Sequence, residues 1–369
     1  MFNIPDYIYS TVFYWTMFII CLVFSLYYVS SSDNHLLLKQ NNRIPAILFS
    51  IVLIVFIGYR PISGRFQDMM AYAHQFERIV IPNFADIHWD GEWGLELLMN
   101  VCKVNSWSAT TFFLIVAFFY VALQTYACKK LMWENVLLGV LFCISAFSFW
   151  GFATNGIRNG MACSIALVGI CQIIKKEHLP ALLTCLFAIG VHRSTILPIM
   201  MAILAVYVIK SPKGAIYFWL ISILLSLLFG DAIVRLFILL GFDDRMTLYL
   251  TLSSANQGFT YTGFRWDFLL YSSIPIVLTW YVTQKRGIQD PIFNKLTTTY
   301  ILSNAFWIMV IRAAFSNRFA YLSWFIYPIL LAYLFIRIPL WENQDKKAGL
   351  ALLLHASFTI GMFLIGKLY

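Results

Sequence analysis

Three polar residues, Asn155, Arg158 and Asn159, stand where two apolar segments meet, in the stretch FATNGIRNGMACSIALVGI. A guanidinium in the first turn of a helix suits an anion, because a helix N-terminus offers free backbone N–H groups and the positive end of the dipole. Asn155 can cap this helix, because an asparagine side chain accepts hydrogen bonds from the backbone N–H groups at a helix start. The alternative is a polar turn at a membrane surface. The density of polar residues favours a site, and we predict that Arg158 contacts an anionic ligand.

A second polar interruption, His192 and Arg193, divides another long apolar run in LFAIGVHRSTILPI. Polar groups at such depth are costly, so they generally face a partner or a watery cavity. His192 is a candidate general base, and Arg193 is a candidate ligand-binding cation. A histidine that is simply hydrogen-bonded in a core remains the alternative.

Two arginines, Arg60 and Arg65, bracket a turn in GYRPISGRFQDMMAYAHQF. The pattern after Arg65 predicts a helix with Asp68 and Tyr72 four residues apart on one face. Asp68 either favours the dipole of this helix or serves as a carboxylate among arginines, which makes it a second candidate base.

Residues with metal-ligating side chains alternate in FADIHWDGEWGLELLMNV, at Asp86, His88, Asp90 and Glu92. Gly91 breaks this run and no further His or Cys completes a set, so we predict no metal site. Glu92 is instead a candidate acid or acceptor of sugar hydroxyls. Trp93, together with Trp89, predicts an aromatic platform at the membrane interface or against a sugar ring.

Further along the chain, Arg265 precedes an apolar segment, and Asn317 and Arg318 open another. The Asn–Arg pair resembles the arrangement around Arg158. Two helix starts of this kind would suit a diphosphate held from two sides.

The elements that position these residues are membrane spans, because the chain is 61% hydrophobic and only 12% charged. Soluble domains carry about 25% charged residues. Apolar runs near the length needed to cross a bilayer predict an all-α, polytopic transmembrane helical bundle of about 12 spans, forming a single integral membrane domain over residues 1–369. The expected spans are 7–29, 44–58, 108–127, 134–153, 157–174, 179–191, 195–209, 215–240, 266–283, 295–312, 319–337 and 348–366.

Basic residues follow every second span, which indicates topology and not nucleic-acid binding, despite the net charge of +9. This pattern predicts termini outside the cytoplasm and a large extracytoplasmic loop at about 59–107. The 14 residues on the expected cytoplasmic side include 11 lysines, whereas ten of the other 12 are arginines. A guanidinium can bond two phosphate oxygens at once, so this bias favours an anionic ligand over snorkelling. The 12 are Arg60, Arg65, Arg78, Lys103, Arg158, Arg193, Arg235, Arg245, Arg265, Arg312, Arg318 and Lys367.

Five motifs in order resemble the EpsG-like branch of Wzy-type polysaccharide polymerases. They are SGRFQDMMAYAHQF, GEWGLELLMNV, TNGIRNGMACSIAL, GVHRSTILPI and SNRFAYLSWFIYPILL, and the resemblance covers residues 58–335. The first motif departs from the family's pattern, because two more residues precede Asp68 than in the common G-x-D form.

The resemblance implies a membrane glycosyltransferase of the GT-C kind in the bacterial inner membrane, with its site on the periplasmic face. Donor and acceptor would be oligosaccharide repeats on undecaprenyl diphosphate, and a chain-length regulator and a flippase would be partners. Arg158 and Arg318 would hold the donor diphosphate, helped by Arg60, Arg65 or Arg265. His192 or Asp68 would be the base, and no metal or cofactor is required. The open alternatives are an O-antigen ligase, a lipid-linked oligosaccharide flippase, and a membrane O-acyltransferase that uses His192.

Overall fold

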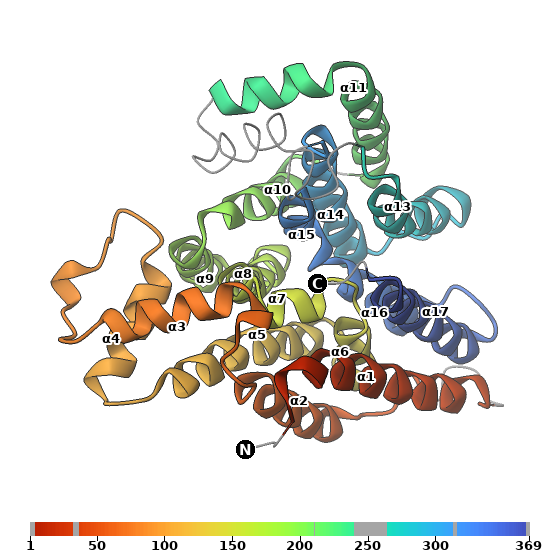
Figure 1. Cartoon of the computed structure of the whole chain (residues 1–369). Helices are drawn as coiled ribbons and strands as arrows, with labels where there is room; N and C mark the ends of the chain where they lie inside the picture. The colour runs from red at the N-terminus through yellow and green to blue at the C-terminus, as the bar shows by residue number, and fades with distance from the viewer. Residues whose placement is uncertain (1–3, 32–36, 210, 240–263, 313–315, 367–369) are drawn as a thin grey trace. The chain divides into compact units, whose positions relative to one another are not determined.

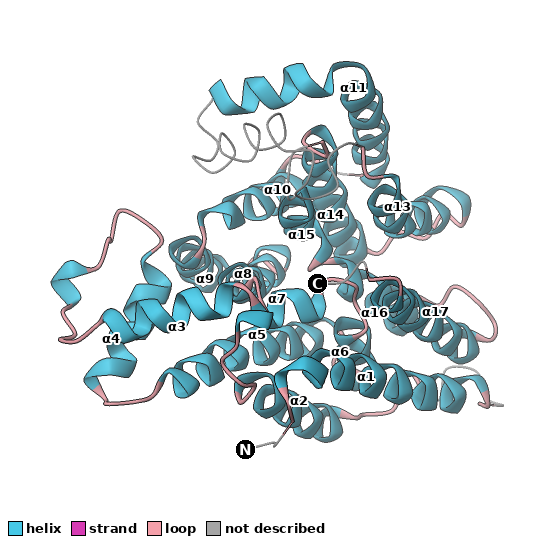
Figure 2. Ribbon diagram, viewed as in Figure 1, coloured by secondary structure: helices cyan, strands magenta, loops and turns pink. Residues whose placement is uncertain are grey.

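The described parts of the chain are helical and contain no strand (Figures 1 and 2). The computed structural model describes residues 4–31, 37–209, 211–239, 264–312 and 316–366. Arg245, Lys367 and the last residue of the span expected at 215–240 lie outside these ranges. The all-α prediction is confirmed for the described residues.

Nine of the expected spans correspond to helices whose ends lie within a few residues of the predicted ones. They are α1 (Asp6–Val29), α2 (Arg43–Gly58), α5 (Ala109–Leu131), α8 (Ile157–Ile174), α9 (His178–Val191), α10 (Ile196–Tyr207), α11 (Pro212–Leu239), α14 (Pro291–Met309) and α17 (Gln344–Leu364). One of these helices, α11, is kinked at Phe229, where the backbone is not helical. Within the described ranges, six segments are long and apolar enough to cross a membrane. The total of about 12 spans stays a prediction.

The other three expected spans are not continuous α-helices, although the third lies within 316–337, which is one of the six segments long and apolar enough to cross a membrane. The first, 134–153, is divided into α6 (Val136–Ile144) and α7 (Phe149–Thr154). The second, 266–283, forms α13 (Trp266–Trp280) and then a π-helical turn. The third, 319–337, forms α15 (Ser316–Trp324) and α16 (Tyr327–Arg337).

The break between α6 and α7 is stabilised by side chains that satisfy polar groups in an apolar setting. The Ser145 hydroxyl lies 2.9 Å from Nδ1 of His355, and the Thr359 hydroxyl donates to the Ser145 carbonyl at 2.7 Å. Non-helical backbone at membrane depth is tolerated only where such partners exist. Apolar periodicity alone therefore does not reveal the break.

The described residues group into two units, Met1–Ile196 with Leu331–Tyr369, and Leu197–Leu330. In the first unit, α1 packs on α17, α2 packs on α5, and α8 packs on both α5 and α9. Most of α8 is buried, and a Cβ at its Gly169 would lie 2.6 Å from Cys185 Sγ. Small residues let membrane helices approach this closely. The single membrane domain inferred from the sequence stays a prediction.

The second unit is organised around α14, which packs on α11 and α15. Hydrogen bonds between side chains link its helices. Trp219 Nε1 donates to Asn304 at 2.8 Å, and Asn304 donates to Ser323 at 3.0 Å. Buried polar groups that are fully paired in this way fix the register of the helices.

The segment expected as a loop at 59–107 contains two helices, α3 (Asp68–Arg78) and α4 (Trp93–Val104). Each has one apolar face, with Met69, Ala73 and Phe76 buried on α3. The helix that the sequence predicted after Arg65 is therefore confirmed. The backbone between Arg78 and Trp93 lacks an α-helix and carries the alternating acidic residues.

Candidate active site

The Glu92 carboxylate contacts three groups that are distant from it in the sequence. Its Oε2 lies 2.7 Å from a terminal guanidinium nitrogen of Arg158. Its Oε1 is hydrogen-bonded to Nδ1 of His192 and accepts the backbone N–H of Arg193 at 3.0 Å. We call Glu92, Arg158 and His192 the carboxylate triad. All three belong to the first unit.

Each member of the carboxylate triad lies at a helix end. Glu92 immediately precedes α4, Arg158 is in the first turn of α8, and His192 immediately follows α9. His192 has extended backbone angles, φ −155° and ψ 116°, so the chain leaves the helix there and its side chain turns towards Glu92. Helix ends leave backbone groups unpaired, and the Glu92 carboxylate satisfies one of them at Arg193.

Two glycines allow α4 to approach α9 and bring Glu92 beside His192. A Cβ at Gly190 would overlap the ring of Trp93, and a Cβ at Gly94 would lie 2.5 Å from Val191. The Trp93 ring packs with centroids 5.7 Å from that of Phe187 and 5.5 Å from that of Trp89. Trp93 thus packs between α4 and α9, and a platform of Trp93 and Trp89 for a sugar ring or the membrane interface stays a prediction.

Arg158 is placed by a similar close approach at Gly160, where a Cβ would overlap the carbonyl oxygen of Phe152 in α7. Tyr120 of α5 donates to the carbonyl of Phe149 at 3.0 Å and so ties α7 to α5. The first turn of α8 therefore packs closely on α7, and at Gly160 there is no room for a larger side chain.

The pKa of Glu92 is lowered from 4.5 to about 2. Burial alone would raise it, but the hydrogen bond and charge of His192, the charge of Arg158 and the Arg193 N–H outweigh burial. The carboxylate is therefore ionised at any physiological pH. An ionised carboxylate only accepts hydrogen bonds, so the hydrogen between it and His192 belongs to Nδ1.

The carboxylate triad keeps groups available for a ligand. His192 Nε2 and the remaining guanidinium nitrogens of Arg158 make no hydrogen bond within the described ranges. The three side chains are 18% to 20% exposed, so a ligand can reach them while solvent screening stays limited. The site therefore presents a guanidinium and the Nε2 edge of an imidazole side by side. Nε2 donates a hydrogen bond when His192 carries the charge that lowers the pKa of Glu92, and it accepts one when the ring is neutral.

Asn155 has a different role from the one predicted. The N-cap of α8 is Gly156, and it has no side-chain cap, so the expectation that Asn155 caps α8 is wrong. The Asn155 side chain instead accepts the N–H of Asp68 at 3.1 Å and donates to Gln67 at 2.8 Å. The reason is that the Asn155 side chain lies against the start of α3 and not against the start of α8.

The hydrogen bond from the Asp68 N–H to Asn155 places the backbone of Asp68 next to the residues that precede α8. Gln67, which the sequence reasoning did not single out, has a φ of 39°, an unusual value for a residue other than glycine. No sequence signal marks that conformation. The Asn159 side chain bonds within α8, where its oxygen accepts a hydrogen bond from the Cys163 thiol at 3.2 Å.

Arg60 lies inside the protein. It is 2% exposed and donates to the carbonyls of Ile57, at 2.7 Å, and Thr154, at 3.2 Å. The rings of Phe66 and Phe113 flank its guanidinium at 5.7 and 5.4 Å. Arg60 therefore ties the end of α2 to the end of α7.

The other predicted residues of the first unit are more exposed than Arg60. Arg65 lies 3.9 Å from Asp6 and is largely exposed. Arg193 is exposed, and its guanidinium donates to the carbonyl of Asp90. Tyr72 is partly buried on α3.

The second unit holds the remaining predicted site residues. Arg265 forms two hydrogen bonds with Asp267, at 2.9 and 2.8 Å, and its guanidinium lies over the Phe268 ring. Asn317 is exposed and Arg318 is partly buried, both in the first turn of α15. That Arg318 and Arg158 share a ligand stays a prediction.

Across the described residues, no group of three or more His, Cys, Asp or Glu side chains could hold a metal ion. The alternating segment forms other contacts. His88 pairs with Glu96 at 3.2 Å, and Asn83 donates to Asp86 at 3.0 Å.

Comparison with known proteins identifies one protein family that the chain matches. The model described as the EpsG family matches residues 43–367, which covers most of the chain and all five motifs. The resemblance inferred from those motifs is confirmed. No curated protein and no solved structure matches the chain.

Proposed function

The chain belongs to the EpsG family, and from this premise we propose that it is a polysaccharide polymerase, a glycosyltransferase of the bacterial inner membrane. Family membership and the apolar helices point to a membrane protein of polysaccharide biosynthesis. The single observation that carries the enzymatic part is the carboxylate triad, in which one ionised carboxylate holds a guanidinium and an imidazole together. Its three members come from three of the five motifs.

The proposed donor is a growing glycan on undecaprenyl diphosphate, and the proposed acceptor is one repeat unit on the same lipid. The acceptor hydroxyl attacks the anomeric carbon, and the bond from that carbon to the diphosphate oxygen breaks. Negative charge then grows on the leaving diphosphate. The free nitrogens of Arg158 stabilise this charge, an electrostatic role that needs no metal.

The acceptor hydroxyl must lose its proton during attack. His192 suits this role in its neutral form, because its Nδ1 hydrogen is held by Glu92 and Nε2 is then the acceptor. Asp68 remains the second candidate, since Asn155 ties its backbone to the start of α8.

We propose that the carboxylate triad lies on the periplasmic face, which the positive-inside pattern of the sequence supports. Arg65, Arg193, Arg265 and Arg318 would attract the anionic lipid to the same face. Tyr72 and Trp93 would contact sugar. A flippase would supply the acceptor, and a chain-length regulator would act on the product.

The experiment is complementation followed by reconstitution. A host deleted for this gene should make only single-repeat surface glycan, and the intact chain should restore a ladder on a gel. The purified protein in lipid vesicles should then extend lipid-linked repeats without added metal, and excess EDTA should not reduce the rate. A ladder that persists in the deleted host, or that requires a divalent cation, would contradict the proposal.

The same experiment separates the alternatives. A ligase would leave lipid-linked polymer intact and abolish only its transfer to a final acceptor. A flippase would leave the repeat unit unreacted on the wrong side of the membrane. An O-acyltransferase would change acyl content without changing chain length.

A further inference from the structure

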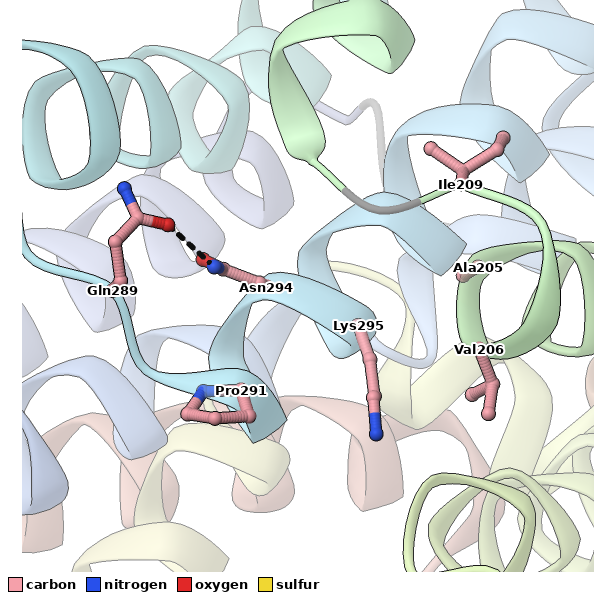
Figure 3. A pocket seen from close by; sticks show the side chains of 7 residues that line it. All are labelled: Ala205, Val206, Ile209, Gln289, Pro291, Asn294 and Lys295. Carbon is pink, nitrogen blue, oxygen red and sulfur yellow. Dashed lines mark hydrogen bonds between the residues drawn. The ribbon is translucent and has the colours of Figure 1, made fainter.

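A cavity of about 290 Å³ lies within the second unit, between the end of α10 and the start of α14 (Figure 3). Its polar side chains do not converge on one point. The Asn294 amide donates to Gln289 Oε1 at 2.8 Å, whereas the Lys295 side chain extends in a different direction. A ligand site needs a few polar groups that converge, so we assign no ligand to this cavity. A stronger relationship lies in the first unit, at Gln67.

The backbone of Gln67 has a conformation that a residue with a Cβ rarely adopts, with φ 39° and ψ −96°. Two other described residues besides glycine, Ser106 and Lys176, have a positive φ, and each directly follows the C-cap of a helix. A left-handed residue at that position is an ordinary way to end a helix. Gln67 instead precedes α3, and its ψ is far from the value of about +47° of the left-handed helical region. Helix termination therefore does not explain its conformation.

The strain at Gln67 follows from burial on both sides of it. Phe66 is 3% exposed, and its ring lies 6.1 Å from that of Tyr9. Met69, in the first turn of α3, is fully buried. Gln67 therefore connects two segments whose side chains are both fixed in apolar surroundings. Strain of this kind persists only where the surrounding structure imposes it, and it is concentrated at functional sites.

The side chain of Gln67 holds the turn that leads into α8. Its Oε1 accepts a hydrogen bond from the Asn155 amide at 2.8 Å, while Asn155 Oδ1 accepts the Asp68 N–H at 3.1 Å. Two residues, Asn155 and Gly156, separate α7 from α8, and α8 has no side-chain cap of its own. Asn155 lies three residues before Arg158, so the start of α3 braces the turn that carries this guanidinium.

We propose that Gln67 is a positioning residue for Arg158 and acts through the Asn155 amide. This inference rests on the role of Arg158 in the proposed function. Relaxing the Gln67 backbone would withdraw its Oε1 from Asn155, and the first turn of α8 would then move more freely relative to Glu92. The guanidinium would meet the leaving diphosphate less often in the productive geometry, and a misplacement of about 1 Å can cost about 10²-fold in rate.

Three substitutions separate the side chain of Gln67 from its backbone. Gln67→Met keeps the length of the side chain and the strained φ but removes the acceptor. Gln67→Glu keeps an oxygen acceptor. Gln67→Gly removes both the acceptor and the strain. Ser106→Gly is the matched control, because it relieves a positive φ at an exposed residue outside the site.

The first measurement is polymer formation by the purified protein in lipid vesicles. Gln67→Met and Gln67→Gly should lower kcat about tenfold and change KM less than about twofold, because Arg158 acts on charge that grows in the transition state. Gln67→Glu should keep about a third or more of the wild-type kcat, and Ser106→Gly should keep all of it. Both glycine variants should unfold about 2 °C higher than wild type, since the strain is gone. A role in folding alone does not give a Gln67→Gly enzyme that is more stable and slower.

The second measurement is hydrogen exchange, which tests the brace independently of the reaction. The backbone amides of residues 160–163 bond to the first turn of α8. They should exchange faster in Gln67→Met and Gln67→Gly than in wild type, and at the wild-type rate in Gln67→Glu and Ser106→Gly. If the wild-type chain makes no polymer, the proposed function fails, and these exchange rates still decide whether Gln67 braces α8.

Three results would overturn the proposal. The first is a normal kcat in Gln67→Met. The second is equal exchange of residues 160–163 in all variants. The third is a Gln67→Gly protein that loses kcat and unfolding temperature together, which would assign Gln67 to folding alone. If Gln67→Gly does not fold, the contrast between Gln67→Met and Gln67→Glu decides, and equal kcat in these two variants would contradict the brace.

Discussion

Glu92 and Arg158 form an ion pair of 2.7 Å that joins the start of α4 to the first turn of α8. His192 shares the same carboxylate. The pair thus does more than neutralise a charge, because it fixes the relative positions of the two groups proposed to act on the leaving group and on the acceptor hydroxyl.

The first prediction concerns Glu92→Gln. This change keeps the shape of the side chain but removes the charge that holds two partners. We expect the variant to lose most activity and about 1–3 kcal/mol of stability, because a partly buried cation is left without its counter-charge. Glycan ladders measure the first effect, and thermal unfolding in detergent measures the second. Wild-type activity in Glu92→Gln would contradict the role of the carboxylate.

The same variant gives a pH prediction. The folded-state pKa of Glu92 is about 2 against an ordinary 4.5, so its contribution to stability is full above about pH 4.5 and is lost as pH falls towards 2. One pKa unit corresponds to about 1.4 kcal/mol, so the contribution has an upper bound on the order of 3 kcal/mol. Between pH 5 and pH 3, the unfolding temperature of wild type should fall more steeply than that of Glu92→Gln. Parallel curves would show that Glu92 is not held as described.

The second prediction tests the approach of α4 to α9. Gly190→Ala adds one methyl group against the Trp93 ring and should move Glu92 away from His192 without changing any charge. Activity should fall at least tenfold. The control is Gly214→Ala in α11, where a Cβ meets nothing within 4 Å and should be neutral or stabilising by about 0.5–1 kcal/mol. Equal activity of the two variants would show that the close approach at Gly190 is not needed for activity.

The third prediction concerns Asn155, whose side chain accepts the first N–H of α3. Asn155→Ala should cost about 1 kcal/mol, the usual value of a lost cap, whereas Asn155→Asp keeps the acceptor and should cost less. Hydrogen exchange should report faster opening of residues 68–71 in Asn155→Ala. Unchanged exchange there, or equal losses in both variants, would argue against the cap.

The fourth prediction separates Arg60 from Arg158. Arg60→Ala removes the side-chain donor to the carbonyls of Ile57 and Thr154, and the Ile57 carbonyl still accepts from the backbone N–H of residue 60, so we expect a loss of about 1–3 kcal/mol. We expect low membrane levels but nearly normal activity per folded molecule. Normal levels of an inactive protein would instead assign Arg60 to the ligand.

The apolar pattern predicted helix positions well and helix continuity poorly. It placed α1, α8 and α17 within a few residues, because membrane length and composition are local properties. The break at Ser145 depends on His355 and Thr359 from α17, which are distant in the sequence. A pattern within one segment carries no information about such partners.

The candidate residues were identifiable by type, since Arg158 and His192 are costly interruptions of apolar sequence and Glu92 lies in a run of residues with ligating side chains beside Trp93. Their shared contact was not, because it requires Gly94 and Gly190 to bring two helices together. The predicted cap at Asn155 was wrong for a similar reason. Residue type indicated a capping side chain, but the fold determined which helix it caps.

The most direct test of the central claim is Arg158→Lys, which keeps the charge but loses the planar guanidinium that can bond both Glu92 and a phosphate. It should be compared with Arg78→Lys, the same change on the exposed end of α3, in the deleted host at equal membrane levels. The account predicts only single-repeat glycan from Arg158→Lys and a full ladder from Arg78→Lys. A full ladder from both variants would contradict a guanidinium-specific role for Arg158.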